Sequence, residues 1–144
     1  MIQRKSFDRI LGALRLRPGD QVLCYVPGDS PPAPSAAVTI PENIPIRGRI
    51  RMPEGTARGV ILGGVCVSWA VARLPDEDGI RQITVETDPA HRGRGYAVQC
   101  LSALRREINE PLLYLCLKEN RASAAAAEKA GFVLLYTYIP EKEK

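Results

Sequence analysis

The segment IRQITVETDPAHRGRGYAVQC, residues 80–100, joins an extended stretch to an amphipathic one through Gly93 and Gly95. Residues 80–87 are rich in isoleucine, valine and threonine, which is typical of a strand. Residues 95–108 place apolar side chains at the spacing of one helical face and so predict a helix. The two glycines therefore lie at a predicted strand-to-helix junction.

This junction has the chemistry of an anion site. A helix N-terminus carries unpaired N–H groups and the positive end of the helix dipole. The glycines have no side chain to keep a phosphate from those groups, and Arg92 and Arg94 add positive charge. The pattern predicts a diphosphate held largely by backbone amides. A turn that needs glycine only to change direction would have the same sequence, so the motif alone leaves both interpretations open.

Two further helices are expected outside this junction. The first begins at Ser6, a favourable N-cap, after which apolar residues recur at helical spacing. The second follows Asn120, another good N-cap, and Gly131 supplies its C-terminal stop. Each helix would bury one apolar face on a sheet.

The expected strands, in chain order, are 21–26, 46–51, 60–62, 65–73, 80–87, 112–117 and 132–139. The helix at 95–108 is long enough to connect two parallel strands. The residues before it favour hairpins. We therefore expect an α+β fold with a mixed, mostly antiparallel sheet.

A proline-rich segment interrupts the first half of the chain. Residues 27–45 hold six of the twelve prolines, which predicts a long loop, and loops of this length are often functional or mobile. Four arginines follow it, and they face an acidic substrate or guard the edge strand expected at 46–51: Arg47, Arg49, Arg51 and Arg58.

The composition of residues 1–144 is that of one globular domain, with 45% hydrophobic and 25% charged residues. A net charge of +4 and 6% aromatic residues are too low to indicate nucleic-acid binding. No apolar run reaches the roughly 18 residues of a membrane span, so we expect no membrane partner and a cytoplasmic location. The four cysteines form no C-x-x-C pair and His91 is alone, so no metal site is expected.

A second motif gives the junction its context. The segment NRASAAAAEKAGF, residues 120–132, follows the predicted strand at 112–117. Together with the arginine–glycine loop it closely resembles the GNAT acetyltransferase superfamily. Residues 92–97 fit that family's Q/R-x-x-G-x-G/A loop, and the second signature is matched by Asn120, Ser123, Lys129, Gly131 and Phe132.

The resemblance covers about residues 59–139, and residues 1–58 carry no motif that we can match. Within the superfamily, VETDPAHRGRGYA is most similar to a bacterial branch with V-x-T-x-P before the arginine loop. The resemblance implies a three-layer α/β/α fold whose central sheet is splayed around a cofactor cleft. It also implies acetyl-CoA as the cosubstrate, with no metal.

The family's cofactor contacts carry over to three groups of residues. The resemblance implies that the backbone of Val85, Glu86 and Thr87 pairs with the pantetheine arm. It implies that Asn120 and Ser123 contact the pantetheine or the far side of CoA. The pyrophosphate would be held by the loop and first helical turn: Arg92, Gly93, Arg94, Gly95, Tyr96, Ala97 and Val98.

The expected function is therefore N-acetyl transfer from acetyl-CoA to a primary amine, by direct attack in a ternary complex. The acceptor is a small molecule or a peptide that no motif identifies, and a homodimer is compatible with the family. The alternative is a non-catalytic acyl-CoA-binding or regulatory module.

The catalytic residues are where this chain departs from the family. The position of the usual tyrosine is Ala127, and a glutamate used by some members is replaced by Leu115. Glu86 remains as the base, directly or through a water, unless it is a plain solvent-facing strand carboxylate. Tyr136 and Tyr138 either supply the acid or only pack in the last strand.

Overall fold

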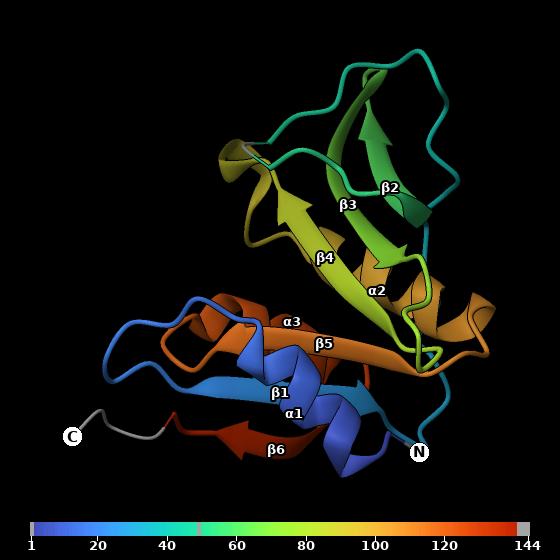
Figure 1. Ribbon diagram of the computed structural model, residues 1–144. Helices are drawn as coiled ribbons and strands as arrows, with labels where there is room; N and C mark the ends of the chain where they lie inside the picture. The colour runs from blue at the N-terminus through green and yellow to red at the C-terminus, as the bar shows by residue number, and fades with distance from the viewer. Residues whose placement is uncertain (1, 49, 141–144) are drawn as a thin grey trace.

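The computed structural model describes residues 2–48 and 50–140, and their course is drawn in Figure 1. Within these residues one sheet carries the strands in the order β2-β3-β4-β5-β1-β6. The helical elements are α1 (Arg4–Gly12), η1 (Pro89–His91), α2 (Tyr96–Glu107) and α3 (Arg121–Lys129). The strands are β1 (Val22–Pro27), β2 (Gly55–Leu62), β3 (Val65–Arg73), β4 (Arg81–Thr87), β5 (Leu112–Leu117) and β6 (Phe132–Tyr138).

The centre of the sheet is open. Strands β4 and β5 are parallel and pair only at Arg81–Leu112 and Gln82–Leu113, whereas the other neighbouring strands are antiparallel. Beyond these two pairs β4 and β5 diverge, and Figure 1 shows the wedge between them. The expected mixed, mostly antiparallel and splayed sheet is confirmed. Helix α2 connects the two diverging strands.

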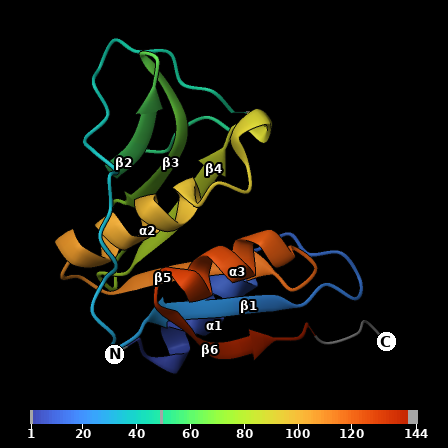
Figure 2. The same ribbon diagram turned by 180° about the vertical axis from the view of Figure 1, so that it is seen from behind.

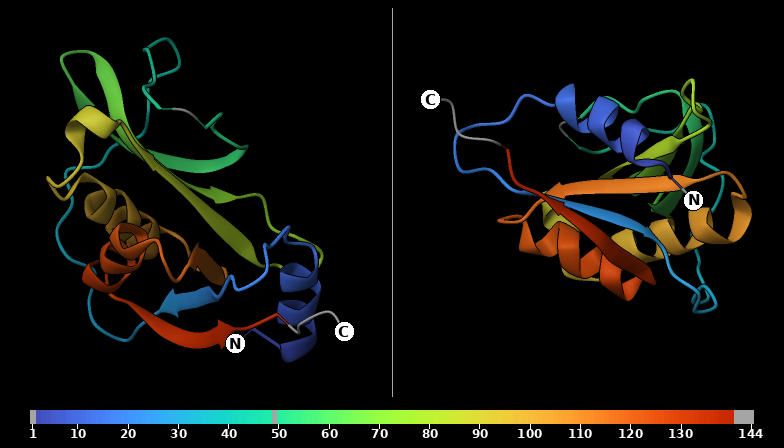
Figure 3. Two further views of the ribbon diagram at one scale, coloured as in Figure 1. Left: turned by 90° about the vertical axis from the view of Figure 1, so that its left-hand side faces the viewer. Right: turned by 60° about the horizontal axis from the view of Figure 1, so that its bottom comes forward.

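Helices cover both faces of the sheet. Figure 2 shows α2 and α3 on one face, and Figure 3 shows α1 on the opposite face of the β5-β1-β6 half. Leu101 and Leu104 of α2 pack with Leu112 and Phe132 in the larger core. On the other face, Phe7 and Ile10 of α1 lie in a second core. The expected three-layer arrangement is confirmed for this half.

The other half of the sheet has a loop in place of a helix on the face opposite α2. Ile40, Ile44 and Met52 pack against a buried cluster that contains Trp69 and Val71 of β3. The proline-rich segment therefore supplies a third small core. The contact of this segment with β3 places Ile50 beside the wedge between β4 and β5.

The strand expected at 46–51 is not formed. Ile46 makes an isolated parallel bridge with Cys66, and Gly48 has a φ of 139°, which is outside the strand region. Arg49 lies outside the described residues. The edge of this half is instead β2, which is longer than the expected 60–62.

The first helix begins three residues earlier than expected. Gln3 is its N-cap, and Ser6 lies inside the helix, where its hydroxyl donates to Asp78 at 2.9 Å. Ser6 is thus a buried tether between α1 and the turn before β4. Across the described ranges, no helix is both long enough and apolar enough to cross a bilayer.

Candidate functional site

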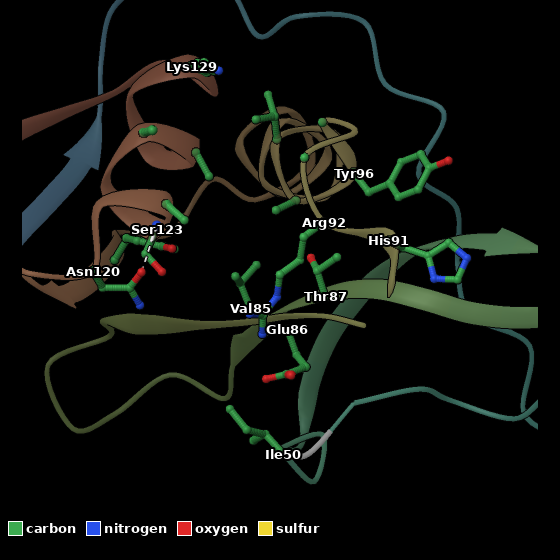
Figure 4. Close-up of a pocket in the computed structure, with 18 residues that line it drawn as sticks. Ile50, Val85, Glu86, Thr87, His91, Arg92, Tyr96, Asn120, Ser123 and Lys129 are labelled. Carbon is green, nitrogen blue, oxygen red and sulfur yellow. Dashed lines mark hydrogen bonds between the residues drawn. The ribbon is translucent and has the colours of Figure 1, made fainter. Parts of the chain in front are cut away.

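A cleft of about 500 Å³ opens in the wedge between β4 and the starts of α2 and α3 (Figure 4). Eleven of the twelve residues expected at the cofactor site line it: Val85, Glu86, Thr87, Arg92, Gly93, Gly95, Tyr96, Ala97, Val98, Asn120 and Ser123. Arg94 is exposed and is not part of the lining. Residues that are far apart in the chain thus meet at one place.

The glycine loop is shaped by its backbone. Gly93 and Gly95 both have a φ of 78°, and a Cβ at either position would meet nothing within 4 Å. Glycine is therefore required by the left-handed conformation and not by crowding. The open space beside both residues leaves their amides accessible. An anion can approach this backbone closely.

The first turn of α2 presents free donors to the cleft. Gly95 is the N-cap residue and has no side chain that could cap the helix. The first hydrogen bond of the helix runs from the Gln99 amide to the Gly95 carbonyl oxygen, at 3.2 Å. The amides of Tyr96, Ala97 and Val98 precede that bond, so they have no acceptor within the helix. With the helix dipole, they form a site for a negatively charged group.

The loop before α2 is held in place by a local network. His91 and Asp88 lie 2.8 Å apart through Nδ1 and Oδ2, and the Asp88 amide donates to the Val67 carbonyl at 2.8 Å. His91 also lines the cleft. Its bond to Asp88 gives it a structural task, which sequence patterning did not reveal.

Strand β4 has one paired and one free edge. It pairs with β3 from Ile83 to Thr87, and the Thr87 and Ser68 hydroxyls are 2.8 Å apart. The edge that faces β5 has no strand partner after Gln82. An extended ligand can add to such an edge through main-chain hydrogen bonds.

Asn120 combines two roles that the sequence left open. Its Oδ1 accepts a bond from the Ser123 amide at 3.2 Å, which makes it the side-chain cap of α3. Both residues also line the cleft (Figure 4). The cap orients the start of α3, and α3 forms the wall opposite β4.

Glu86 is buried, so it is not the solvent-facing carboxylate that the sequence left as an alternative. It is 8% exposed, and in Figure 4 its carboxylate points from β4 toward Ile50, away from the side on which Tyr96 lies. Within residues 2–48 and 50–140 it has no hydrogen bond and no ion pair. A largely buried carboxylate without a partner among these residues is costly, which makes Glu86 a candidate for contact with a ligand.

Sequence analysis missed Tyr114 as a cleft residue. It stands in β5, is 3% exposed and lines the cleft. Burial raises the pKa of its hydroxyl to about 12, so the group stays protonated at neutral pH. Its run of apolar neighbours predicted a core strand, and no local signal distinguishes a tyrosine that reaches a cleft.

The two tyrosines named as acid candidates lie elsewhere. The ring of Tyr136 is 6.3 Å from that of Phe7, measured between centroids, and it packs on α1. Tyr138 packs against the same core. Neither lines the cleft, so their interpretation as packing residues is the one that fits the structure.

Comparisons with known proteins identify the family and the fold. The family model for the acetyltransferase (GNAT) family matches residues 26–132. A curated relative, the uncharacterised N-acetyltransferase YjdG of Bacillus subtilis, is 35% identical over 65 residues. That match covers 42% of this chain and 39% of the relative, so the likeness spans about two fifths of the relative's length.

Two solved structures share the fold. One is a protein assigned to the GNAT acetyltransferases from Novosphingobium aromaticivorans, with a TM-score of 0.61, 17% identity, and coverage of 86% of this chain and 66% of the other. The second, a GNAT acetyltransferase from Colwellia psychrerythraea, has a TM-score of 0.57 and 14% identity, with coverage of 89% and 57%. At these identities the likeness is one of fold.

Proposed function

This chain belongs to the GNAT family of acetyltransferase enzymes, and on that premise we propose that it transfers the acetyl group of acetyl-CoA to a primary amine. The observation that carries the proposal is one cleft that joins a free strand edge, a row of unpaired helix amides and a buried carboxylate. These are the elements that hold an extended acyl-CoA, bind its diphosphate and take a proton from an amine.

The cofactor cleft is proposed to hold acetyl-CoA along β4. The pantetheine arm would add to the free edge at Val85, Glu86 and Thr87, with Asn120 and Ser123 on the opposite wall. Its pyrophosphate would lie against the amides of residues 93–98. The left-handed glycines, which leave open space beside this backbone, support that placement.

The chemistry is proposed to be direct attack in a ternary complex. The amine nitrogen attacks the thioester carbonyl carbon, and its proton passes to Glu86, directly or through a water. A backbone amide of β4 near Val85 stabilises the oxyanion. The tetrahedral intermediate, in which the C–N bond is already formed, then collapses: the C=O double bond forms again and the C–S bond breaks. Tyr114, which is protonated at neutral pH, can supply a proton to the leaving thiolate.

A non-catalytic acyl-CoA-binding module is the second candidate. Ala127 at the family's usual tyrosine position favours it. The burial of Glu86 favours the enzyme, because a module that only binds CoA has no use for an unpaired carboxylate on the far side of β4. A homodimer and a cytoplasmic location stay predictions.

The test is calorimetric titration with acetyl-CoA, followed by free-thiol release over a panel of amines. Saturable binding together with amine-dependent thiol release would establish the transferase. Binding without release from any amine would favour the module. No binding would contradict both.

A further inference from the structure

The described part of residues 38–52, which we call the strap, crosses the face of the sheet opposite α2 (teal in Figure 1). Val38 and Gly59 exchange backbone bonds of 2.9 and 2.8 Å, and Pro45 and Arg47 each bond the backbone of Cys66 at 2.9 Å. The strap is thus tied to both β2 and β3. Ile50, near the end of the strap, lines the cleft.

The strap covers Glu86 through a glycine. A Cβ on Gly48 would lie 2.7 Å from Glu86 Cγ and 3.5 Å from its Oε1, so the backbone passes directly over the carboxylate. Trp69 lies opposite Glu86 in the β3–β4 pairing and is fully buried, and its Nε1 has no partner within the described ranges. A carboxylate that is 8% exposed on β4, and a buried donor without a described partner at the paired position of β3, together indicate a place for a polar ligand.

The negative charge of Glu86 determines that a positively charged part of the ligand binds beside it. A carboxylate that is more than nine-tenths buried is stabilised by a cation, and the amine of an acceptor arrives as an ammonium ion. Glu86 would hold that ammonium beside the acyl cleft and then accept its proton. This step rests on the proposed acetyl transfer.

The strap also carries positive charge on the residues next to Gly48 and Ile50. Arg47 and Arg51 are exposed and have no side-chain hydrogen bond or ion pair within the described residues. Other arginines are engaged: Arg58 pairs with Glu107 at 2.7 Å, and Arg9 with Asp76 at 2.7 Å. Since residues 46–51 do not form an edge strand, these charges do not guard a sheet edge. They flank the residues next to the buried carboxylate.

We infer that the acceptor carries a carboxylate close to its primary amine, with the ammonium held by Glu86 and the carboxylate by Arg47 and Arg51 of the strap. Opposite charges on the protein, a buried carboxylate and exposed arginines on the strap that covers it, match the two ends of such an acceptor. Arginine also forms paired hydrogen bonds with a carboxylate, which adds orientation to attraction. A free amino acid and the N-terminus of an acidic peptide share this chemistry.

The test compares thiol release from matched acceptors at saturating acetyl-CoA. One pair is alanine and alaninamide. The other is a peptide amide with two aspartates after a free N-terminal alanine, and the same peptide with asparagines. Spermidine serves as a carboxylate-free amine. In one of the two pairs, we expect kcat/KM to be at least about tenfold higher for the member that carries the carboxylate. A tenfold change is about the contribution of one ion pair with good geometry.

The outcomes separate the two proposals. Preference within the first pair alone assigns a small amino acid, and preference within the second pair alone assigns an acidic N-terminus. Equal or faster turnover of the uncharged members and of spermidine overturns the inference and leaves the acetyltransferase standing. No thiol release from any amine overturns the proposed function and, with it, this inference.

A charge-removal variant tests the strap itself. Replacement of both strap arginines, Arg47→Gln with Arg51→Gln, should raise KM for the preferred acceptor about tenfold while kcat and the Kd of acetyl-CoA stay within twofold. The matched control is Arg4→Gln with Lys5→Gln, two exposed charges at the start of α1. An unchanged KM in the strap variant, or an equal rise in the control, overturns the inference.

Discussion

The two faces of strand β4 are built in different ways. On one face, the glycine loop and the first turn of α2 present backbone amides, all of them within residues 93–98. On the other face, Glu86 is enclosed by a strap that comes from an earlier part of the chain. The first site is local and made of main chain, so one short motif specifies it. The second depends on long-range packing and on side chains, and it is where members of one fold can differ in acceptor.

The strongest way to break this comparison is to place a charge in the amide site. Gly95→Asp puts a carboxylate beside the amides of α2, and we expect the Kd of acetyl-CoA to rise at least about a hundredfold, or roughly 3 kcal/mol. Gly95→Asn is the control. Asparagine and aspartate both tolerate the left-handed backbone of this position, and their side chains differ mainly in charge. Calorimetry measures the affinity. Equal losses in the two variants would show that shape, and not charge, decides.

A change on the opposite face should affect turnover and spare the cofactor. Glu86→Gln removes the base, and kcat should fall by about 10²–10⁴-fold, the usual share of a general base. The Kd of acetyl-CoA should stay within twofold, because the carboxylate points away from the α2 side of β4. Steady-state kinetics over a range of pH measure this, with exposed Glu42→Gln as the control. A pH–rate profile identical to that of the unmodified chain would remove Glu86 from the mechanism.

The strap can be shifted without the replacement of any proposed functional side chain. Gly48→Ala introduces a Cβ 2.7 Å from Glu86 Cγ at a φ of 139°. We expect the free energy of unfolding to fall by about 1–2 kcal/mol and acceptor KM to rise, with acetyl-CoA affinity unchanged. Gly12→Ala is the control, because nothing lies within 4 Å of its Cβ and its φ is not positive. Chemical denaturation and kinetics report the two effects. A Gly48→Ala chain with unaltered stability and KM would mean that the strap does not press on Glu86.

The smallest effect is expected at the far wall of the cleft. Asn120→Ala removes the cap of α3 and should cost about 1 kcal/mol of stability. Asn120→Asp keeps an acceptor for the Ser123 amide and should cost much less. Thermal unfolding compares the two. If Asn120→Ala lowers the free energy of acetyl-CoA binding by more than it lowers the free energy of unfolding, the side chain contacts the cofactor as well as the helix.

Local pattern predicted the amide site because its physics is local. The strand, the two glycines and the helix are adjacent in sequence, and the left-handed backbone at Gly93 and Gly95 can be taken only by a few residue types. Asn120 was likewise predicted as a cap from its place before the helix. Eleven of the twelve predicted residues line the cleft, and those outside the loop and α2 were expected from the family resemblance and not from local pattern. Arg94 does not line it because the turn leaves its side chain in solvent.

The strap was mispredicted for a physical reason that applies widely. The alternation in IRGRIR, residues 46–51, is typical of an edge strand, but Gly48 adopts a conformation that ends any strand pairing. What holds this segment is apolar contact of Ile44 and Met52 with the Trp69 cluster, which no local window contains. The position of β1 between β5 and β6 escaped prediction in the same way, because strand order is set by tertiary packing.

The two residue pairs that join β4 to β5 have a thermodynamic consequence. Two half-sheets that share so few hydrogen bonds can open as separate cooperative units, with α2 as the main bridge between them. A ligand that lies along the free edge of β4 acts as a removable strand and links the halves. The chain should then gain about 2.7 kcal/mol of stability at a ligand concentration of 100 times Kd. Hydrogen exchange in β4 and β5 would slow first, as expected of a ligand that completes the sheet.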